Sequence, residues 1–89
     1  MNRVYKALAD PTRRTILKLL RGKDMTAGEI AGHFPVTKAT LSRHFAVLKE
    51  ADLIRGEKQG TTITYALNVS VIEDALIELM NALNIKQKG

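Results

Sequence analysis

The most constraining feature of this sequence is a pair of helix-start signals separated by one proline, between residues 26 and 51. Thr26 stands three residues before Glu29, which is the pattern of a capping box. This pattern predicts a short helix over about Ala27 to His33, with Ile30 and Phe34 pointing inward. Pro35 ends that helix, because proline lacks the backbone N–H that a helix interior requires.

A second, longer helix follows the proline directly. Thr37 is suited to cap a helix that runs from about Lys38 to Ala51. Its apolar residues recur at i, i+4 and i+7, and they predict one buried face: Leu41, Phe45 and Leu48. A short helix, a tight turn and a longer helix together predict a helix-turn-helix.

The segment after this helix predicts a β-hairpin over residues 53–67. Ile63, Tyr65 and Leu67 alternate with smaller or more polar residues, a period of two that is typical of a strand. Gly60 supplies the turn between the strands. A hairpin placed directly after a helix-turn-helix is the wing of a winged helix. The expected fold is therefore mainly α with a β-hairpin, a winged helix-turn-helix. Tyr65 is expected in the core in preference to contacting phosphate.

Two further helices are predicted before the helix-turn-helix. Residues 3–9 form a short helix, and Asp10 and Pro11 then suit the N-cap and first turn of a helix that ends near Gly22. Arg13 and Arg14 open this second helix. Cations at a helix N-terminus oppose the helix dipole, so we favour a solvated or ion-paired role over a phosphate contact.

The last predicted helix, which ends near Asn84, is apolar over much of its surface. Ser70 and Glu73 repeat the capping-box spacing at its start. Its apolar stripe is wider than one core seam needs: Ile72, Ala75, Leu76, Leu79, Met80 and Leu83. Part of this stripe is expected on the chain's own core. The rest is expected to be buried against a second copy, together with residues of the first helix: Val4, Tyr5 and Leu8.

Length and charge restrict the possible partners. A chain of 89 residues without cysteine makes one small domain, 1–89, that has no disulfides and gains stability from oligomerisation. Its 14 Lys and Arg outnumber 9 Asp and Glu, for a net charge of +5. Residues 1–68 hold 12 basic and 6 acidic residues, whereas residues 71–83 hold three acidic residues and no basic one. The first part is therefore predicted to bind a polyanion, such as DNA.

The polar face of the helix 38–51 is the candidate DNA-contacting surface. The major groove admits one α-helix, whose back is held by packing while its front stays polar. Arg43 suits a bidentate contact with guanine, and Thr37 and Lys38 suit phosphate contacts at the helix N-terminus. For His44, phosphate contact and simple packing are both open. The hairpin adds further candidates near its tip: Arg55, Lys58, Gln59 and Thr61.

Three segments of this chain resemble the ArsR-type winged helix-turn-helix repressors: residues 7–17, 25–31 and 38–48. Within that family the chain is most similar to the autorepressor subgroup related to the regulator of sporulation-delaying proteins. The resemblance implies a homodimer, built on the first and last helices, that binds a partly palindromic operator in double-stranded DNA, often at its own promoter. The family's polar recognition positions fall on Thr37, Lys38, Ala39, Thr40, Ser42, Arg43 and His44.

The chain departs from the metal-sensing members of that family. Many relatives bind metals through a cysteine pair in the first helix of the motif, and the matching stretch 27–33 has no thiol. Others bind zinc through Asp/His and His/Glu pairs on the last helix, which here has three acidic residues but no His. We therefore expect no metal and no cofactor, and a metal-responsive repressor is an alternative hypothesis. The hairpin tip reads Gly60-Thr61 where the family often has Gly-Arg, so wing affinity is expected from Lys58 and Arg55.

Other functional classes have less support. Ser42 and His44 face different directions on one helix, and no nucleophile elbow or phosphate loop is present, so no enzyme is expected. A winged helix can also bind proteins, which makes a protein-interaction module the second alternative and a sequestering protein a candidate partner. The sequence has no apolar run of about 18 residues and no signal-peptide pattern, which predicts no membrane insertion and a cytoplasmic location.

Overall fold

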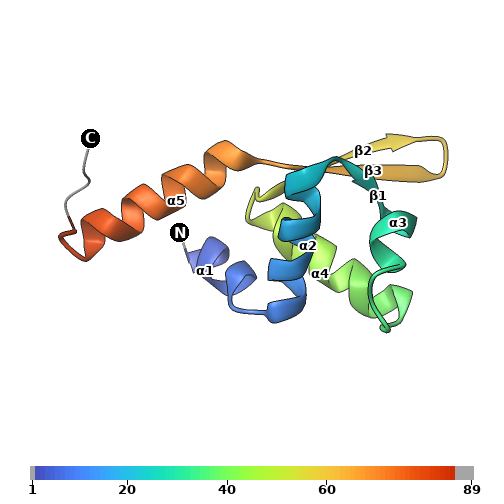
Figure 1. Ribbon diagram of the computed structural model, residues 1–89, viewed down its shortest axis with the longest axis horizontal. Helices are drawn as coiled ribbons and strands as arrows, with labels where there is room; N and C mark the ends of the chain where they lie inside the picture. Colours follow the sequence, from blue (N-terminus) through green and yellow to red (C-terminus); the bar gives the residue numbers. More distant parts are fainter. Residues whose placement is uncertain (1, 86–89) are drawn as a thin grey trace.

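The computed structural model describes residues 2–85. Its elements in chain order are α1 (Asn2–Leu8), α2 (Pro11–Gly22), β1 (Met25–Thr26), α3 (Ala27–Ala31), α4 (Lys38–Glu50), β2 (Ile54–Gln59), β3 (Thr62–Leu67) and α5 (Val69–Ala82). Helices α1 to α4 form a central body, the β2–β3 hairpin extends from one end, and α5 leaves from the other (Figure 1). The molecule is accordingly elongated, 44 × 21 × 19 Å. The predicted winged helix-turn-helix is confirmed.

Three of the four predicted helix caps are formed. Asp10 Oδ2 accepts a hydrogen bond from the Arg13 backbone N–H (3.1 Å), and Thr37 Oγ1 accepts one from the Thr40 N–H (3.1 Å). Thr26 and Glu29 make both bonds of the capping box, at 2.9 and 3.1 Å. The backbone N–H of Thr26 stabilises the carboxylate and holds the pKa of Glu29 below its ordinary value. These local signals were readable from sequence because each bond spans only three residues.

The capping box predicted at Ser70 is wrong. Helix α5 begins at Val69, and Ser70 Oγ instead donates to Asn68 Oδ1 (3.1 Å). The cause is tertiary. The backbone N–H of Asn68 donates to the Leu53 carbonyl (2.9 Å), and its side-chain amide donates to the Asp52 carbonyl (3.0 Å). These two bonds turn the chain into the helix directly after β3, so Ser70 falls within the first turn.

Among the described residues, the sheet has three strands, whereas the sequence predicted only the two strands of the hairpin; the additional strand is β1. Its strand order is β1-β3-β2, with Met25 opposite Tyr65 and Thr26 opposite Thr64. A two-residue strand has no alternation to detect, so only its pairing with β3 reveals it. This pairing joins the start of α3 to the wing.

A stacked aromatic pair lies where the wing meets α4. The rings of Phe45 and Tyr65 are 4.5 Å apart between centroids, with an interplanar angle of 29°. Gly56 lies opposite Tyr65 in the ladder, and a Cβ at Gly56 would come within 3.1 Å of that ring. Tyr65 is buried, as expected for a core residue, and burial raises the pKa of its hydroxyl. A glycine at position 56 therefore leaves the space in which the two rings stack.

Helix α4 ends in a Schellman motif whose left-handed residue is Asp52. The Leu53 N–H donates to the Leu48 carbonyl (3.0 Å), and Asp52 has a φ of 60°. Both leucines are fully buried, so the motif also joins α4 to β2 through the core. Glycine is the residue that takes this conformation without strain.

Replacing Asp52 with glycine is expected to stabilise the fold. Asp52→Gly relieves the left-handed strain and removes a negative charge from a helix C-terminus, for a gain of about 0.5–1 kcal/mol. Urea unfolding of the purified protein measures this difference. Asp52→Asn is the control: it removes only the charge and should recover part of the gain. A loss of stability in Asp52→Gly would contradict the prediction.

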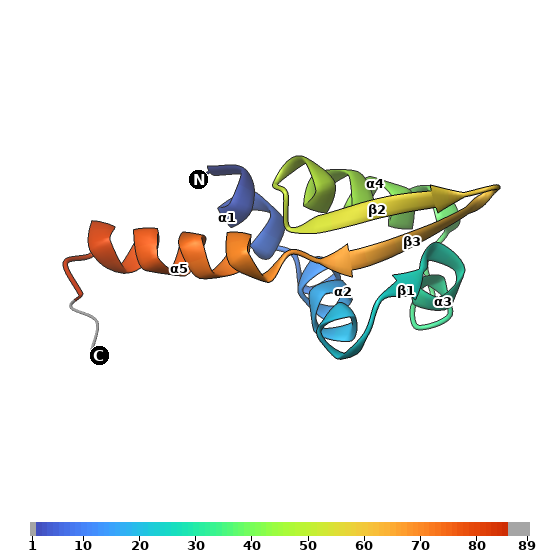
Figure 2. The same cartoon turned by 90° about the horizontal axis from the view of Figure 1, so that it is seen from above.

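Helix α5 packs on the core only at its beginning. Ala75 is buried, and Val71 and Ile72 pack against the core. The remainder of the helix projects away from the body, as Figure 2 shows from above. Within residues 2–85, none of the helices has the length and apolar character needed to cross a membrane.

Candidate nucleic-acid interface

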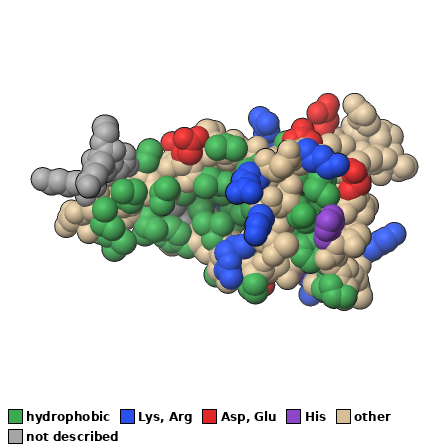
Figure 3. Space-filling view, in the orientation of Figure 1, with side chains coloured by type: hydrophobic (Ala, Val, Ile, Leu, Met, Phe, Trp, Pro, Cys, Tyr) green, Lys and Arg blue, Asp and Glu red, His purple; other side chains and the backbone are tan. Residues whose placement is uncertain are grey.

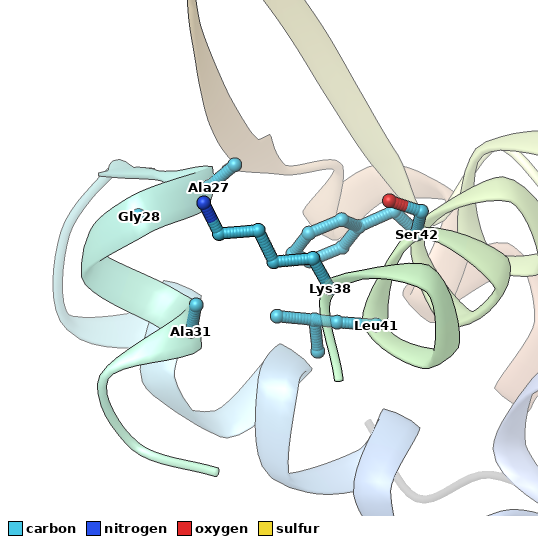
Figure 4. A pocket seen from close by; sticks show the side chains of 7 residues that line it. Ala27, Gly28, Ala31, Lys38, Leu41 and Ser42 are labelled. Carbon is cyan, nitrogen blue, oxygen red and sulfur yellow. The ribbon is translucent and has the colours of Figure 1, made fainter. Parts of the chain in front are cut away.

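The helix-turn-helix consists of α3 and α4, and the back of α4 is fully packed. Leu41, Phe45 and Leu48 are all buried, as predicted. A pocket of about 210 Å³ lies between the two helices, and Leu41 and Phe45 are among the residues that line it. Figure 4 shows the Lys38 side chain running across this pocket toward α3. The pocket is smaller than ligand sites of about 300–1,000 Å³, so we interpret it as a packing groove between the helices.

The front of α4 is exposed. The exposed recognition positions are Thr37, Lys38, Ala39, Thr40, Ser42 and Arg43. Thr37 Oγ1 donates to Thr40 Oγ1 (3.0 Å) in addition to capping the helix. This leaves the Thr40 hydroxyl proton free to donate outward. The arrangement presents hydroxyl groups and two cations on one helix end, which is chemistry that suits phosphates and base edges.

His44 lies apart from these exposed residues. Its side chain is 16% exposed, and Nδ1 lies 3.2 Å from Arg13 Nη1 and 3.9 Å from Asp10 Oδ2. Partial burial alone would raise the pKa of Asp10, but the hydrogen bonds from the backbone N–H groups of Arg13 and Thr12 and the nearby Arg13 guanidinium outweigh it and lower that pKa. The sequence left two roles open for His44, phosphate contact and packing. Its contacts with Arg13 and Asp10 within the chain favour packing.

Arg13 and Arg14 both donate hydrogen bonds to backbone carbonyls at the C-terminal end of α1. Arg13 donates to the carbonyls of Ala7 (Nε, 2.8 Å) and Lys6 (Nη2, 2.7 Å). Arg14 Nη1 donates to the Leu8 carbonyl (2.8 Å). The last carbonyls of a helix have no partner within it, and cations there complement the dipole. The sequence favoured a solvated or ion-paired role for these two arginines over a phosphate contact. It did not predict that they bind the end of α1, because the acceptors are backbone carbonyls.

The two basic residues of the wing, Arg55 and Lys58, lie on opposite faces of β2. The turn has Gly60 at a φ of 61°, and Arg55, Lys58, Gln59 and Thr61 are all exposed. Successive residues of a strand face opposite sides, so Arg55 and Lys58 lie on different faces of β2. Arg55 lines a surface hollow together with Asp24 and Glu57. Lys58 is closer to the tip, opposite Ile63. Wing contact with DNA is therefore better supported for Lys58 than for Arg55.

The candidate dimer residues divide between core and surface. Val4 and Ala75 are buried within the chain's own core, and Leu8, Ile72 and Met80 are half-buried. The other four are exposed: Tyr5 (38%), Leu76 (57%), Leu79 and Leu83 (61%). In α5 and directly after it, the sequence missed three further exposed apolar residues: Val69, Ile77 and Ile85. They lie outside the stripe, and only their apolar type could have revealed them.

These exposed apolar side chains are concentrated at one end of the molecule. Figure 3 shows hydrophobic side chains gathered over the α5 end, with Lys and Arg side chains over the body. An exposed apolar surface of this kind marks an interaction site. Among residues 2–85, no three His, Asp or Glu side chains lie close enough together to bind a metal ion.

Comparison with known proteins gives the relationship of this chain. A family model described as a helix-turn-helix domain matches residues 8–57. The transcriptional repressor SdpR of Bacillus subtilis is 48% identical over 84 residues, which cover 94% of this chain and 93% of the repressor. The chain belongs to the ArsR family of winged helix-turn-helix regulators.

Solved structures of ArsR-family proteins have the same fold. A crystal structure of an ArsR-family transcriptional regulator is similar with a TM-score of 0.79 and 30% identity, over 97% of this chain and 92% of that one. The homodimeric winged helix-turn-helix DNA-binding domain of a Mycobacterium bovis protein is similar with a TM-score of 0.73 and 27% identity, over 99% and 85% of the two chains. The ArsR fold thus accounts for the projecting α5 as part of the architecture.

Proposed function

We propose that this chain is a transcriptional repressor that binds, as a homodimer, a palindromic operator in its own promoter. The observation that carries the proposal is α4, with a fully packed back and an exposed front of hydroxyls and cations, directly beside a wing. The likeness to a repressor over nearly the whole chain supports the same function. Such a protein acts in the cytoplasm by occupying DNA and not by catalysis.

The homodimer follows from α5. Of its 14 residues only Ala75 is buried, whereas Leu76 and Leu83 are more than half exposed. A helix gains most of its stability from packing an apolar face, so this one requires a partner. A second copy fits because its own α5 offers the same exposed apolar residues, so that two identical stripes can cover each other. We propose that Tyr5 and Leu8 of α1 join this interface.

An isologous dimer also matches the symmetry of a palindrome. Two-fold related α4 helices enter successive major grooves when the half-sites lie about 34–36 Å apart. Each α4 contributes Lys38, Thr40, Ser42 and Arg43, and each wing contributes Lys58 to the flanking backbone. His44 supports α4 from behind in this arrangement.

The direct test is fluorescence anisotropy on the DNA upstream of the chain's own gene, against a scrambled duplex, at two salt concentrations. We expect binding at least about a thousandfold tighter to the upstream DNA, indifferent to a chelator. Equally weak binding to both duplexes, with a Kd of about 10⁻⁴–10⁻⁶ M, would contradict the presence of an operator in this promoter. A pull-down with the full chain would then test the protein-interaction alternative, including a sequestering partner.

Arg43 is expected to contribute specificity. Removal of its guanidinium in Arg43→Ala should cost about 1–3 kcal/mol of operator binding, because a bidentate contact to guanine is lost. A set of operators with single base changes should show relaxed preference at one position. Lys49→Ala, a charge-matched change at the exposed C-terminal end of α4, is the control. Unchanged operator affinity in Arg43→Ala would exclude this assignment.

Lys58 is expected to contribute affinity without specificity. Lys58→Ala should weaken binding to the operator and to the scrambled duplex about equally, because a phosphate contact does not read sequence. The slope of log affinity against log salt should become shallower by about one unit. Arg55→Ala tests the opposite face of the wing and should have the smaller effect. A loss confined to one DNA sequence would contradict the assignment of Lys58 to phosphate.

A further inference from the structure

Arg13 lies where three helices meet, and all three of its guanidinium nitrogens have partners. Nε and Nη2 donate to the Ala7 and Lys6 carbonyls of α1, at 2.8 and 2.7 Å. Nη1 donates to His44 Nδ1 on α4, at 3.2 Å. The backbone N–H of the same residue donates to Asp10, the cap of α2. Through its side chain and its backbone N–H, Arg13 therefore connects the end of α1, the start of α2 and the middle of α4.

The contact with α1 matters because α1 cannot hold itself in place. It has seven residues, and helices shorter than about 12–15 residues are marginal in water. Its buried side chains are Val4 and Ala7, both small. The planar guanidinium satisfies two adjacent carbonyls at the negative end of the helix dipole, which a lysine ammonium cannot do with the same geometry. Arg13 is thus a principal anchor of α1 on the body.

The contact with α4 fixes the ring of His44. The guanidinium is always protonated, so Nδ1 accepts its hydrogen bond and the ring proton lies on Nε2. His44 adjoins Arg43 in the chain, and Ser42 precedes both. The half-buried ring and the exposed Arg43 side chain point to different sides of α4. The buried Leu41, Phe45 and Leu48 hold α4 against the core, and the Arg13–His44 bond adds a polar contact at the residue next to Arg43.

We propose that Arg13 is a positioning residue that couples α1, part of the dimer surface, to the orientation of the recognition helix α4. The proposal rests on the proposed function, because α1 is taken to join the dimer interface. Burying Tyr5 and Leu8 against a second copy would order α1. An ordered α1 would fix the position of the Arg13 guanidinium, which in turn would fix the ring of His44. Dimer assembly would then prepare α4 for DNA without any residue of the interface touching DNA.

Arg14 provides a matched control. It is the next residue on the same helix, carries the same charge, and donates to the neighbouring Leu8 carbonyl at the same end of α1. It has no bond to α4 among the described residues. Arg13→Gln and Arg14→Gln each remove one charge and weaken the hold on α1, but only Arg13→Gln breaks the connection to His44.

Affinity for the upstream DNA, measured above the concentration at which each variant dimerises, tests the coupling. Arg13→Gln should weaken operator binding about tenfold or more, the size of losing a hydrogen bond from a charged group. Arg14→Gln should stay within about threefold of wild type, an ordinary surface effect. His44→Leu should lose as much operator affinity as Arg13→Gln, and a variant with both changes should bind no more weakly than either one alone. His44→Asn should bind like wild type, because its amide oxygen can accept the hydrogen bond from Arg13. Additive losses, or equal losses in Arg13→Gln and Arg14→Gln, would overturn the proposal.

The salt slope and the scrambled duplex separate positioning from direct contact. A positioning role leaves both as in wild type, because no phosphate contact is lost. If Arg13 contacts phosphate, the slope becomes shallower by about one unit and binding to the scrambled duplex weakens as well. That result would overturn the positioning role.

Amide hydrogen exchange of the DNA-free protein gives a readout independent of the operator. Arg13→Gln should lower protection both in α1 and around His44 in α4, whereas Arg14→Gln should lower it in α1 alone. Protection in α4 that is unchanged in Arg13→Gln would overturn the proposal. If wild-type protein does not discriminate between the two duplexes, the proposed operator fails, and the exchange comparison still decides the role of Arg13.

Discussion

The Leu76→Glu variant is expected to be monomeric and to lose specific operator binding. Leu76 is 57% exposed in the single chain, so a carboxylate there leaves the chain's own core intact. In a dimer the same position lies on the apolar face of α5, where burying an unpaired charge costs several kcal/mol. A monomer reaches only one half-site at a time, so affinity should fall at least about 100-fold. Sedimentation and anisotropy measure the two effects.

A matched variant on the polar side of the same helix controls for a changed charge. Glu78 is exposed, with Asp74 at i−4 and Asn81 at i+3 on the same side of α5, so the charge reversal Glu78→Lys should remain dimeric and bind DNA as wild type does. Circular dichroism checks that Leu76→Glu keeps its helices. A Leu76→Glu protein that stays dimeric would show that the subunits associate through another surface.

The Phe45→Ala variant is expected to lose a large part of its stability. Phe45 is buried on the back of α4 and stacks on Tyr65 of β3, so its removal leaves a cavity between the recognition helix and the wing. Substitutions of this kind cost about 3–5 kcal/mol, a large part of the total stability of about 5–15 kcal/mol typical of a folded protein. Urea unfolding measures the loss, and operator binding should fail with it.

Tyr65→Phe distinguishes the role of the ring from that of the hydroxyl. It keeps the stacking on Phe45 and removes only the oxygen, so stability and DNA binding should stay close to wild type. A Tyr65→Phe protein that is as weak as Phe45→Ala would show that the hydroxyl, and not the packed rings, joins the wing to α4.

Local chemistry explains what could be predicted from sequence. The caps at Asp10, Thr26 and Thr37 depend on bonds across three residues, and the buried face of α4 depends on the helical period alone. The wing was predictable because alternation and a turn glycine are also local. The exposed front of α4 follows from the same period, since residues opposite a buried face must face solvent.

Contacts between distant segments explain what the sequence did not reveal. Strand β1 exists only because Met25 and Thr26 meet β3, and α5 starts at Val69 only because Asn68 bonds to the loop after α4. His44 and Arg13 are far apart in the chain, and the acceptors of Arg13 on α1 are backbone carbonyls, which leave no trace in residue type. The order of helices, the caps at Asp10, Thr26 and Thr37, and the wing were determined by sequence, because short-range hydrogen bonds and periodicity encode them. Whether His44 faces outward or is held from behind was decided by tertiary packing, because it depends on the Arg13 side chain that the fold brings against it.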